Sequence, residues 1–395
     1  MRFSERSNWN TEESALSRAH RLRLQAGLPL ADLTASNPTR CGFTYPGDLL
    51  AALADPSALD YDAQPRGSLR AREAVCAYYA DRRIAVSPEQ VVLTTSTSEA
   101  YSYLFRLLCD PGCEILTVRP SYPLFDFLAV LDDVRLRSAA LIYDHGWQID
   151  AQGLREAITP LTRAIMLVHP NNPSGHFTKP HEAAELAQLC REFELSLIVD
   201  EVFLDYGFTA EGASFARGLA GTPLFVVSGL SKIAGLPQMK AAWIVATGPN
   251  AVGALDRLEV IADTFLSMNA PVQCALPTWL DGRAGIQTQI RQRVRANLVE
   301  LDRRFPEADA VDRLAVEGGW YATLRIPAIQ PDERTVLDLL ECGVWVQPGY
   351  FFGMAESGWL VVSLLAAETE FSIGVDILVN YFRTHPCSTS TGLLS

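Results

Sequence analysis

Positive charge is scarce in this chain. Its 395 residues hold 33 lysines and arginines against 46 aspartates and glutamates, which gives a formal net charge of -13 at pH 7. Nucleic acids are bound largely through basic surfaces that displace counterions from phosphates, and no segment of the sequence is dense in lysine or arginine. The composition therefore predicts a protein with no nucleic-acid partner.

Long apolar runs are missing as well. The opening residues 1–6 contain no stretch like the roughly 7–15 apolar residues of a secretion signal. No run elsewhere approaches the roughly 18 apolar residues needed to cross a bilayer. We therefore expect a cytoplasmic protein that does not bind a membrane.

The eight cysteines are scattered and form no C-x-x-C pair. The nearest two, Cys109 and Cys113, are four positions apart (113 - 109), a spacing typical of neither a zinc ribbon nor a redox motif. A Walker A sequence, a G-x-G-x-x-G loop, internal repeats and low-complexity tracts are also absent. The sequence thus predicts free thiols and no metal, and it offers no motif for nucleotide binding.

The apolar residues that are present indicate an α/β fold. Hydrophobic residues make up 48% of the chain, enough for a large core. From about residue 66, helical patterns alternate with short continuous apolar runs, which favours a mostly parallel sheet covered on both faces. Apolar residues at helical spacing within 186–193 predict the helix of a βαβ crossover. The expected strands are 91–95, 114–118, 164–169, 196–200, 224–228 and 241–246.

The character of the sequence changes near each end. Residues 11–26 predict a helix with Asn10 as its N-cap and Glu13 three positions later. After Pro277 the sequence predicts, in order, a long charged helix, a second helix and a strand, at 287–305, 334–342 and 361–365. We therefore expect an N-terminal arm (1–46) that contributes to a small domain, a large α/β domain (47–279), a small α+β domain (280–385) and a disordered tail (386–395).

Three polar groups follow three of the predicted strands. Lys232 lies just beyond the run 224–228, Asp200 ends the run 196–200, and Asn172 follows 164–169. Open α/β sheets bind ligands at the carboxyl ends of their strands, and a lysine that loses its solvation there can act as a Schiff-base nucleophile. Singly, each motif is most often a turn, a cap or a solvated side chain, so the evidence lies in their combination.

In combination and in this order, the motifs resemble those of the fold-type I, pyridoxal-phosphate-dependent aminotransferases of class I/II. The resemblance covers nearly the whole chain and implies that family's fold, with a mostly parallel large sheet and a smaller α+β C-terminal domain. The motifs are Tyr61 with Gly67 and Leu69-Arg70, Thr95-Ser96-Thr97-Ser98-Glu99-Ala100, Pro120-Ser121-Tyr122-Pro123, Asn171-Asn172-Pro173-Ser174-Gly175, Asp200-Glu201-Val202-Phe203, Ser231-Lys232 and Pro348-Gly349.

The resemblance implies a role for each polar group around pyridoxal 5′-phosphate. Lys232 would bind the cofactor covalently and move the substrate proton, and Asp200 would hold a proton on the pyridine nitrogen. Asn172 would contact the phenolic oxygen, and Tyr122 would stack on the ring. The phosphate would be held by residues at a helix N-terminus and after the last parallel strand, namely Ser96, Thr97, Ser98, Ser231 and Lys240. Tyr61 would reach the phosphate of a neighbouring subunit, which implies a homodimer with shared sites.

Three departures from the family concern the cofactor. Phe203 replaces a tyrosine that donates to the phenolic oxygen, so the Schiff base should have a raised pKa. Lys240 stands where the family has an arginine, which loses bidentate contact with the phosphate. Gly229 replaces a serine, although Ser228 or Ser231 could compensate.

The fourth departure concerns the substrate. Val361 stands where the family has the arginine that binds the substrate α-carboxylate, and no arginine occurs between Arg334 and Arg383. Another cation must serve, or the substrate is not an ordinary α-amino acid. Candidate cations are Arg40, Arg66 and Arg325. Asn37, in the same turn-rich segment as Arg40, is a further candidate substrate residue.

The leading functional prediction is a transaminase that exchanges an amino group between an unidentified amino donor and an oxo acid by a ping-pong mechanism. Two alternatives remain open on the same scaffold. One is a lyase that performs β- or γ-elimination with Lys232 as the base, and the other is a cofactor-binding relic without activity.

Overall fold

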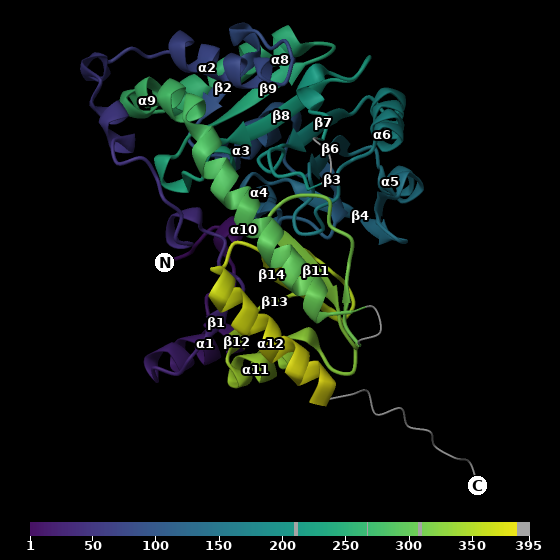
Figure 1. Ribbon diagram of the computed structural model, residues 1–395. Helices are drawn as coiled ribbons and strands as arrows, with labels where there is room; N and C mark the ends of the chain where they lie inside the picture. The colour runs from purple at the N-terminus through teal and green to yellow at the C-terminus, as the bar shows by residue number, and fades with distance from the viewer. Residues whose placement is uncertain (209–211, 267, 307–309, 385–395) are drawn as a thin grey trace.

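The computed structural model describes residues 1–208, 212–266, 268–306 and 310–384. The predicted disordered tail, 386–395, lies outside the described residues. Figure 1 shows a large sheet wrapped by helices and a smaller sheet beside it, joined by one long helix. None of the helices in the described part is long and apolar enough to cross a membrane.

The large sheet has eight strands in the order β2-β9-β8-β7-β6-β3-β4-β5. All six predicted strands belong to it, each within two residues of its predicted bounds. β9 and β5 run antiparallel to their neighbours, while β8, β7, β6, β3 and β4 are parallel. The strands are β2 (Val91–Thr94), β3 (Glu114–Arg119), β4 (Arg135–Tyr143), β5 (Trp147–Ile149), β6 (Thr162–Val168), β7 (Ser196–Asp200), β8 (Leu224–Gly229) and β9 (Ala242–Thr247).

Helices cover both faces of this sheet, which explains why its strands are continuously apolar. Alternate residues of β7 show the division: Ile198 packs into one core layer, while Leu197 and Val199 pack into the other. One layer contains α3 (Thr97–Leu108), α4 (Leu124–Leu131) and α8 (Ala251–Phe265). The other contains α2 (Leu69–Ala80), α5 (Ala151–Ala157), α6 (Pro180–Glu192) and α9 (Ala270–Asp281).

The small sheet is built mainly from the C-terminal part of the chain. Its strand order is β10-β11-β14-β13, all antiparallel, and α10 leads from the large sheet to it (Figure 1). The elements are α10 (Arg283–Arg304), β10 (Asp312–Arg313), β11 (Tyr321–Arg325), α11 (Asp332–Cys342), β12 (Val344–Trp345), β13 (Gln347–Pro348), β14 (Trp359–Ser363) and α12 (Glu368–Thr384).

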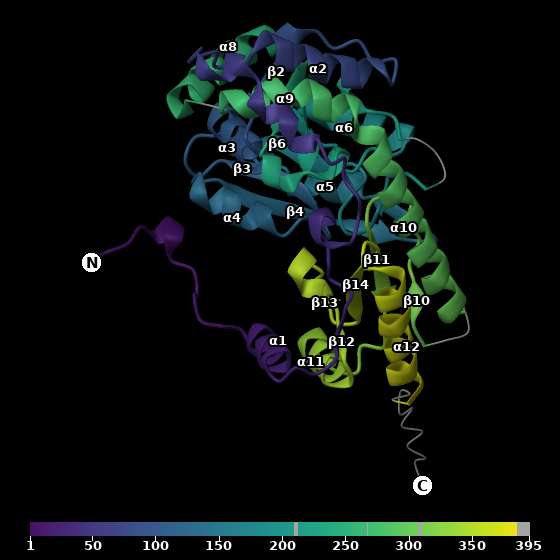
Figure 2. The same cartoon turned by 60° about the vertical axis from the view of Figure 1, so that its left-hand side comes forward.

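The N-terminal arm lies against these C-terminal elements. β1 (Ala31–Asp32) pairs in parallel with β12, and Figure 2 shows α1 (Ala15–Gln25) beside α11. The predicted N-cap was wrong: Ser14, not Asn10, caps α1 by accepting a hydrogen bond from the N–H of Ser17. Asn10 instead accepts from the N–H of Glu12, and Glu13 pairs with Arg21, so the chain enters the helix four residues later than expected.

Candidate active site

The three predicted strand-end groups lie at one edge of the large sheet. β6, β7 and β8 are neighbours, and Val168 pairs with Asp200, which pairs in turn with Val227. The parallel strands therefore end at the same level, and the chain continues from them to Asn172 and Lys232. β2 has the same direction as β8, because both are antiparallel to β9. The start of α3, just after β2, thus lies at the same edge.

Lys232 is held in a short helix directly after β8, α7 (Leu230–Ile233). Its Nζ atom lies 4.9 Å from the centroid of the Trp320 ring and 5.5 Å from that of Phe203. Burial lowers the pKa of the amine to about 8, although the charge of Asp200 acts in the opposite direction. The hydroxyl of Tyr206 donates to the Lys232 carbonyl oxygen over 2.6 Å, which fixes the backbone. Lys232 therefore has the lowered basicity that a nucleophilic amine needs.

Asp200 ends β7 in a buried position, and its two carboxylate oxygens have different partners. Tyr101 donates its hydroxyl to Oδ2 over 2.5 Å, and the N–H of Val202 donates to Oδ1 over 2.9 Å. Burial raises the pKa of the carboxyl group to about 6, while these hydrogen bonds and the charge of Lys232 lower it. The carboxylate is thus held in one orientation, close enough to Lys232 for their charges to interact.

Asn172 and Tyr122 border the same region. Asn172 is buried, and its Oδ1 atom has no hydrogen-bond partner among the described residues. Burial, together with the charges of Asp200 and Tyr321, raises the pKa of the Tyr122 hydroxyl to about 12. The Tyr122 ring stands edge-on to Phe125 at 5.5 Å. A buried polar atom without a partner usually marks a bound water, ion or ligand.

The first turn of α3 presents unpaired backbone donors. Ser96 caps the helix by accepting a 3.1 Å hydrogen bond from the N–H of Glu99. Within the described residues, the N–H groups of Thr97 and Ser98 make no hydrogen bond. Unpaired N–H groups at a helix N-terminus attract anions such as phosphate.

The residues around Lys232 explain one departure from the family pattern. A side chain on Gly229 would place its Cβ 2.8 Å from the Cβ of Ala242 and 2.9 Å from the carbonyl oxygen of Ala241. Strand β9 therefore approaches too closely for a serine. Of the two serines that could compensate, Ser228 is buried with its Oγ unpaired in the described part, and Ser231 is partly exposed in α7. Lys240 is exposed and has a left-handed backbone, with φ of 53°.

An aromatic group stands where the family has a tyrosine hydroxyl. Phe203 is buried and meets Trp320 edge-on at 5.3 Å and Tyr321 at 6.4 Å. Because Phe203 has no side-chain hydroxyl, the Lys232 amine faces the aromatic rings of Phe203 and Trp320 here. The side chain of Tyr321 bonds to that of Ser36 in the arm, which connects the arm to the site.

Val361 lies in a row of three residues across the small sheet. It pairs with Thr323 on β11 and with Gln347 on β13, so the three side chains share one face. Val361 is fully buried. The Oγ1 atom of Thr323 and the Oε1 atom of Gln347 are also buried, and neither has a partner among the residues described. Where the family has a guanidinium, this row has an aliphatic side chain between two unpaired polar atoms.

The other candidate substrate residues are spread out. Arg66 forms ion pairs with Asp256 and Glu259 of α8. Arg325 lies with its guanidinium 5.5 Å from the ring centroid of Trp359. The exposed pair Asn37 and Arg40 lie at the start and end of a short 3-10 turn, and Asn37 accepts a hydrogen bond from the N–H of Thr39. Tyr61 is 83% exposed.

Three tyrosines contact the site, and two of them, Tyr101 and Tyr206, were not predicted. Tyr101 bonds Asp200, Tyr206 bonds the Lys232 backbone, and Tyr321 lies near Tyr122 and Phe203. Tyr101 had a usable signal, since it follows Thr97 by four residues and so lies on the same side of α3. The other two come from segments whose distance to Lys232 only the fold determines.

Comparison with known proteins agrees with this geometry. The sequence profile described as "Aminotransferase class I and II" matches residues 52–373. The glutamate-pyruvate aminotransferase AlaA of Escherichia coli (strain K12) is 29% identical over 342 residues, covering 82% of this chain and 83% of that protein. An alanine aminotransferase of Mycobacterium bovis is 29% identical over 340 residues, covering 81% and 78%. An alanine aminotransferase structure from Pyrococcus furiosus superposes with a TM-score of 0.88 at 23% identity, covering 97% of this chain and 100% of that chain.

The family match and the named relatives together show an enzyme that transfers amino groups. The chain belongs to the class I and II aminotransferases.

Proposed function

We propose that this aminotransferase works with pyridoxal 5′-phosphate attached at Lys232. The proposal is carried by an amine of lowered pKa, a buried carboxylate and the buried amide of Asn172 at one sheet edge; the Oδ1 atom of this amide has no partner among the described residues. The unpaired N–H groups of Thr97 and Ser98 fit the phosphate of such a group. When bound, the cofactor supplies an electron sink for negative charge at the substrate Cα.

Each side chain has a distinct task in this proposal. The Nζ atom of Lys232 would accept the proton from the substrate Cα and release it again, and a pKa near 8 suits an amine that must do both. The Asp200 carboxylate holds a proton on the ring nitrogen, and Tyr101 keeps the carboxylate oriented. Asn172 donates to the phenolic oxygen, and Tyr122 packs on the ring. Ser96, Ser231 and Lys240 complete the phosphate site.

The substrates are an amino donor and an oxo acid in ping-pong exchange. Relatives named for alanine, glutamate and pyruvate support an α-amino acid as donor. Residue 361 offers no cation for the donor carboxylate. Arg40, which makes no ion pair with a described residue, is our candidate to replace it, because it lies in the arm segment whose Ser36 bonds Tyr321.

A panel of amino donors tests the proposal. Cofactor-loaded protein is mixed with donors that have an α-carboxylate and with matched amines that lack one, while absorption reports formation of pyridoxamine phosphate. Pyridoxamine phosphate formed from α-amino acids supports transamination of an ordinary donor. Conversion of carboxylate-free amines alone would contradict the donor class, release of oxo acid and ammonia in one pass would indicate a lyase, and absence of any conversion would indicate a relic.

We further propose a homodimer in which Tyr61 reaches the phosphate of the partner subunit. Its support is the 83% exposure of Tyr61, together with the exposed Leu59 and Leu266, which a second copy could cover. Mixing the inactive variants Lys232→Ala and Tyr61→Ala should restore activity, because some hybrid dimers contain one site with both residues intact. A monomer in light scattering, or no restoration on mixing, would contradict the shared site.

A further inference from the structure

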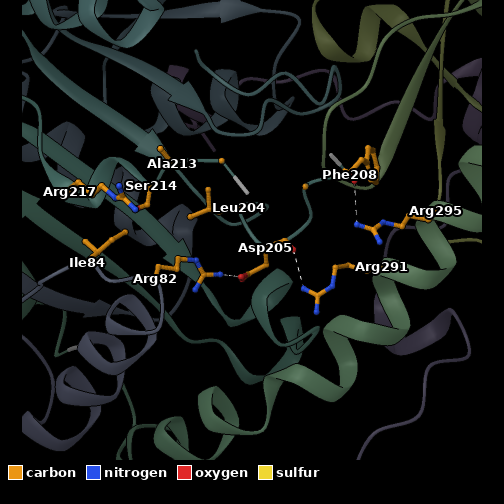
Figure 3. Close-up of a pocket in the computed structure, with 12 residues that line it drawn as sticks. Arg82, Ile84, Leu204, Asp205, Phe208, Ala213, Ser214, Arg217, Arg291 and Arg295 are labelled. Atoms are coloured by element: carbon orange, nitrogen blue, oxygen red, sulfur yellow. Dashed lines mark hydrogen bonds and ion pairs between the residues drawn. The ribbon is translucent and has the colours of Figure 1, made fainter. Parts of the chain in front are cut away.

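One cavity is lined by residues other than Lys232, Asp200 and Asn172. It has a volume of about 600 Å³ and is bordered by the chain after α2, the segment after β7 and one side of α10 (Figure 3). Asp205, in its wall, directly precedes Tyr206, whose hydroxyl bonds the Lys232 backbone. The cavity is therefore a neighbour of the Lys232 segment and not part of the proposed cofactor site.

Four arginines from three separate segments line this cavity. Arg291 and Arg295 are four residues apart on α10 and so share one side of the helix. Arg82 follows α2, and Arg217 ends the 3-10 helix Phe215–Arg217. Figure 3 shows Arg82 and Arg217 entering from one side and the two α10 arginines from the other, with all four guanidinium groups directed inward.

The described carboxylates do not balance the positive charges of the cavity. Asp205 is the single carboxylate among the described lining residues, and it already forms an ion pair with Arg82 and accepts a 3.1 Å hydrogen bond from the Tyr78 hydroxyl. In the described part of the chain, no carboxylate lies within ion-pair distance of Arg217, Arg291 or Arg295. About three positive charges thus share one cavity in a chain whose formal charge is -13.

The arginines also keep hydrogen-bond donors available. Arg291 donates to the carbonyl oxygen of Asp205 at 3.3 Å, and Arg295 donates to that of Phe208 at 3.4 Å. Each guanidinium has five N–H groups, so most of them remain free. The backbone N–H of Arg217 donates to the carbonyl oxygen of Ser214, but its guanidinium makes no hydrogen bond to any residue that the structure describes. Guanidinium groups in this state are suited to bidentate binding of phosphate or carboxylate.

We propose that this cavity binds a small metabolite that carries a diphosphate. Three guanidinium groups without a carboxylate partner among the described residues match an anion of two or more charges, and like charges that line one cavity repel unless an anion lies between them. The volume is that of a small-molecule site and is too small for a nucleic-acid strand.

Titration calorimetry with inorganic pyrophosphate tests this proposal on the cofactor-loaded enzyme. We expect one site per chain, with affinity that falls as salt is added. Arg217→Gln and Arg291→Gln should each weaken binding by at least about tenfold, or ~1.4 kcal/mol. Arg303→Gln removes the same charge from α10 at a position that pairs with Glu300 and should change affinity by less than about twofold.

The controls separate this site from the cofactor site. Arg217→Gln is the more informative variant, because the side chain holds no described residue in place and its loss should not affect folding. Absence of pyrophosphate binding, or binding that neither variant weakens, would overturn the proposal. Loss of binding in Lys240→Gln instead would place the anion at the cofactor phosphate site and would also overturn it. Tighter binding of citrate than of pyrophosphate would replace the diphosphate with a polycarboxylate.

Discussion

The edge of the large sheet and the row of Thr323, Val361 and Gln347 in the small sheet differ in how closely they match the family pattern. At the large-sheet edge, Lys232, Asp200 and Asn172 are all present and brought together. In the small sheet, Val361 stands between Thr323 and Gln347 at the position where the sequence resemblance implies an arginine. The groups that we propose for proton transfer therefore match the family pattern, whereas the position that we propose for donor recognition does not.

The physical settings of the two regions account for this difference. Each group at the large-sheet edge depends on the others, since Asp200 and Lys232 shift each other's pKa and Tyr101 orients Asp200. Removal of one leaves a buried charge without its partner. Val361 packs in an apolar core and has no charged partner, so a change at this position leaves the proton-transfer groups intact.

The largest expected effect is the loss of Lys232. Lys232→Ala should lower the transamination rate by at least about 10²–10⁴-fold, because one group acts as both nucleophile and proton carrier. The chain has only three lysines, Lys179, Lys232 and Lys240, so borohydride reduction followed by peptide mass analysis identifies the modified residue directly. Lys240→Ala is the matched control and should retain the reducible imine. Trapping of the cofactor on Lys179 or Lys240 in the wild-type protein would refute the assignment.

The second prediction concerns pH. Because burial lowers the Lys232 pKa to about 8, the amine loses its proton at a lower pH than an exposed lysine does. Only the neutral amine attacks an aldehyde, so the rate at which cofactor-free protein takes up pyridoxal phosphate should rise with pH to a plateau, with a midpoint near pH 8. Stopped-flow absorption measures this rate. A midpoint near that of a free lysine, about 10.4, would show that the amine is solvated.

Val361→Arg tests the row in the small sheet that departs from the family pattern. A guanidinium at this position should raise kcat/KM for common α-amino acids by about 10–100-fold, the value of a charge-assisted pair with a carboxylate. Val361→Met is the control for size without charge and should give no gain. If Val361→Arg folds and brings no improvement with alanine or glutamate, another cation already binds the carboxylate. Arg40→Gln would then be the variant that loses activity.

Gly229→Ser tests whether close packing explains why a glycine stands at position 229, at the edge of the large sheet, where the family has a serine. Its side chain would meet Ala242 and the Ala241 carbonyl group, so we expect the free energy of unfolding to fall by about 1–3 kcal/mol. Gly285→Ser on α10 is the control, because a Cβ there meets nothing within 4 Å. Urea unfolding measures both variants. A Gly229→Ser protein as stable as the wild type, with tighter cofactor binding, would show that the serine was lost for another reason.

The smallest expected effect comes from Phe203→Tyr. The ring lies 5.5 Å from the Lys232 amine, so the new hydroxyl can donate to the cofactor's phenolic oxygen and favour its deprotonated state. The pKa seen in the absorption of the bound cofactor should fall by about one unit, or ~1.4 kcal/mol. Phe352→Tyr adds the same hydroxyl beside Tyr321 and should leave this pKa unchanged. A rise in the Phe203→Tyr variant would contradict the orientation proposed for residue 203.

The sequence alone determined six of the eight strands of the large sheet and the set of polar groups at the ends of three of them. Parallel strands covered on both faces must be continuously apolar, so consecutive apolar residues such as Ile198 and Val199 predict a buried strand. Strands β4 and β5 escaped prediction because they lie near the sheet edge, and β4 mixes exposed and buried residues. The N-cap of α1 was misplaced because Asn10 and Ser14 are both good caps and only the packing of the arm chooses between them.

Tertiary structure alone decided which distant residues surround Lys232 and which positions tolerate change. Tyr206, Trp320 and Tyr321 reach the site through loops and through the contact between the two sheets, which no local pattern encodes. Whether Gly229 could carry a side chain depended on the approach of β9. Local sequence fixes periodicity and chemical type, whereas distances between segments follow from packing, because a long-range contact depends on every element that lies between its partners.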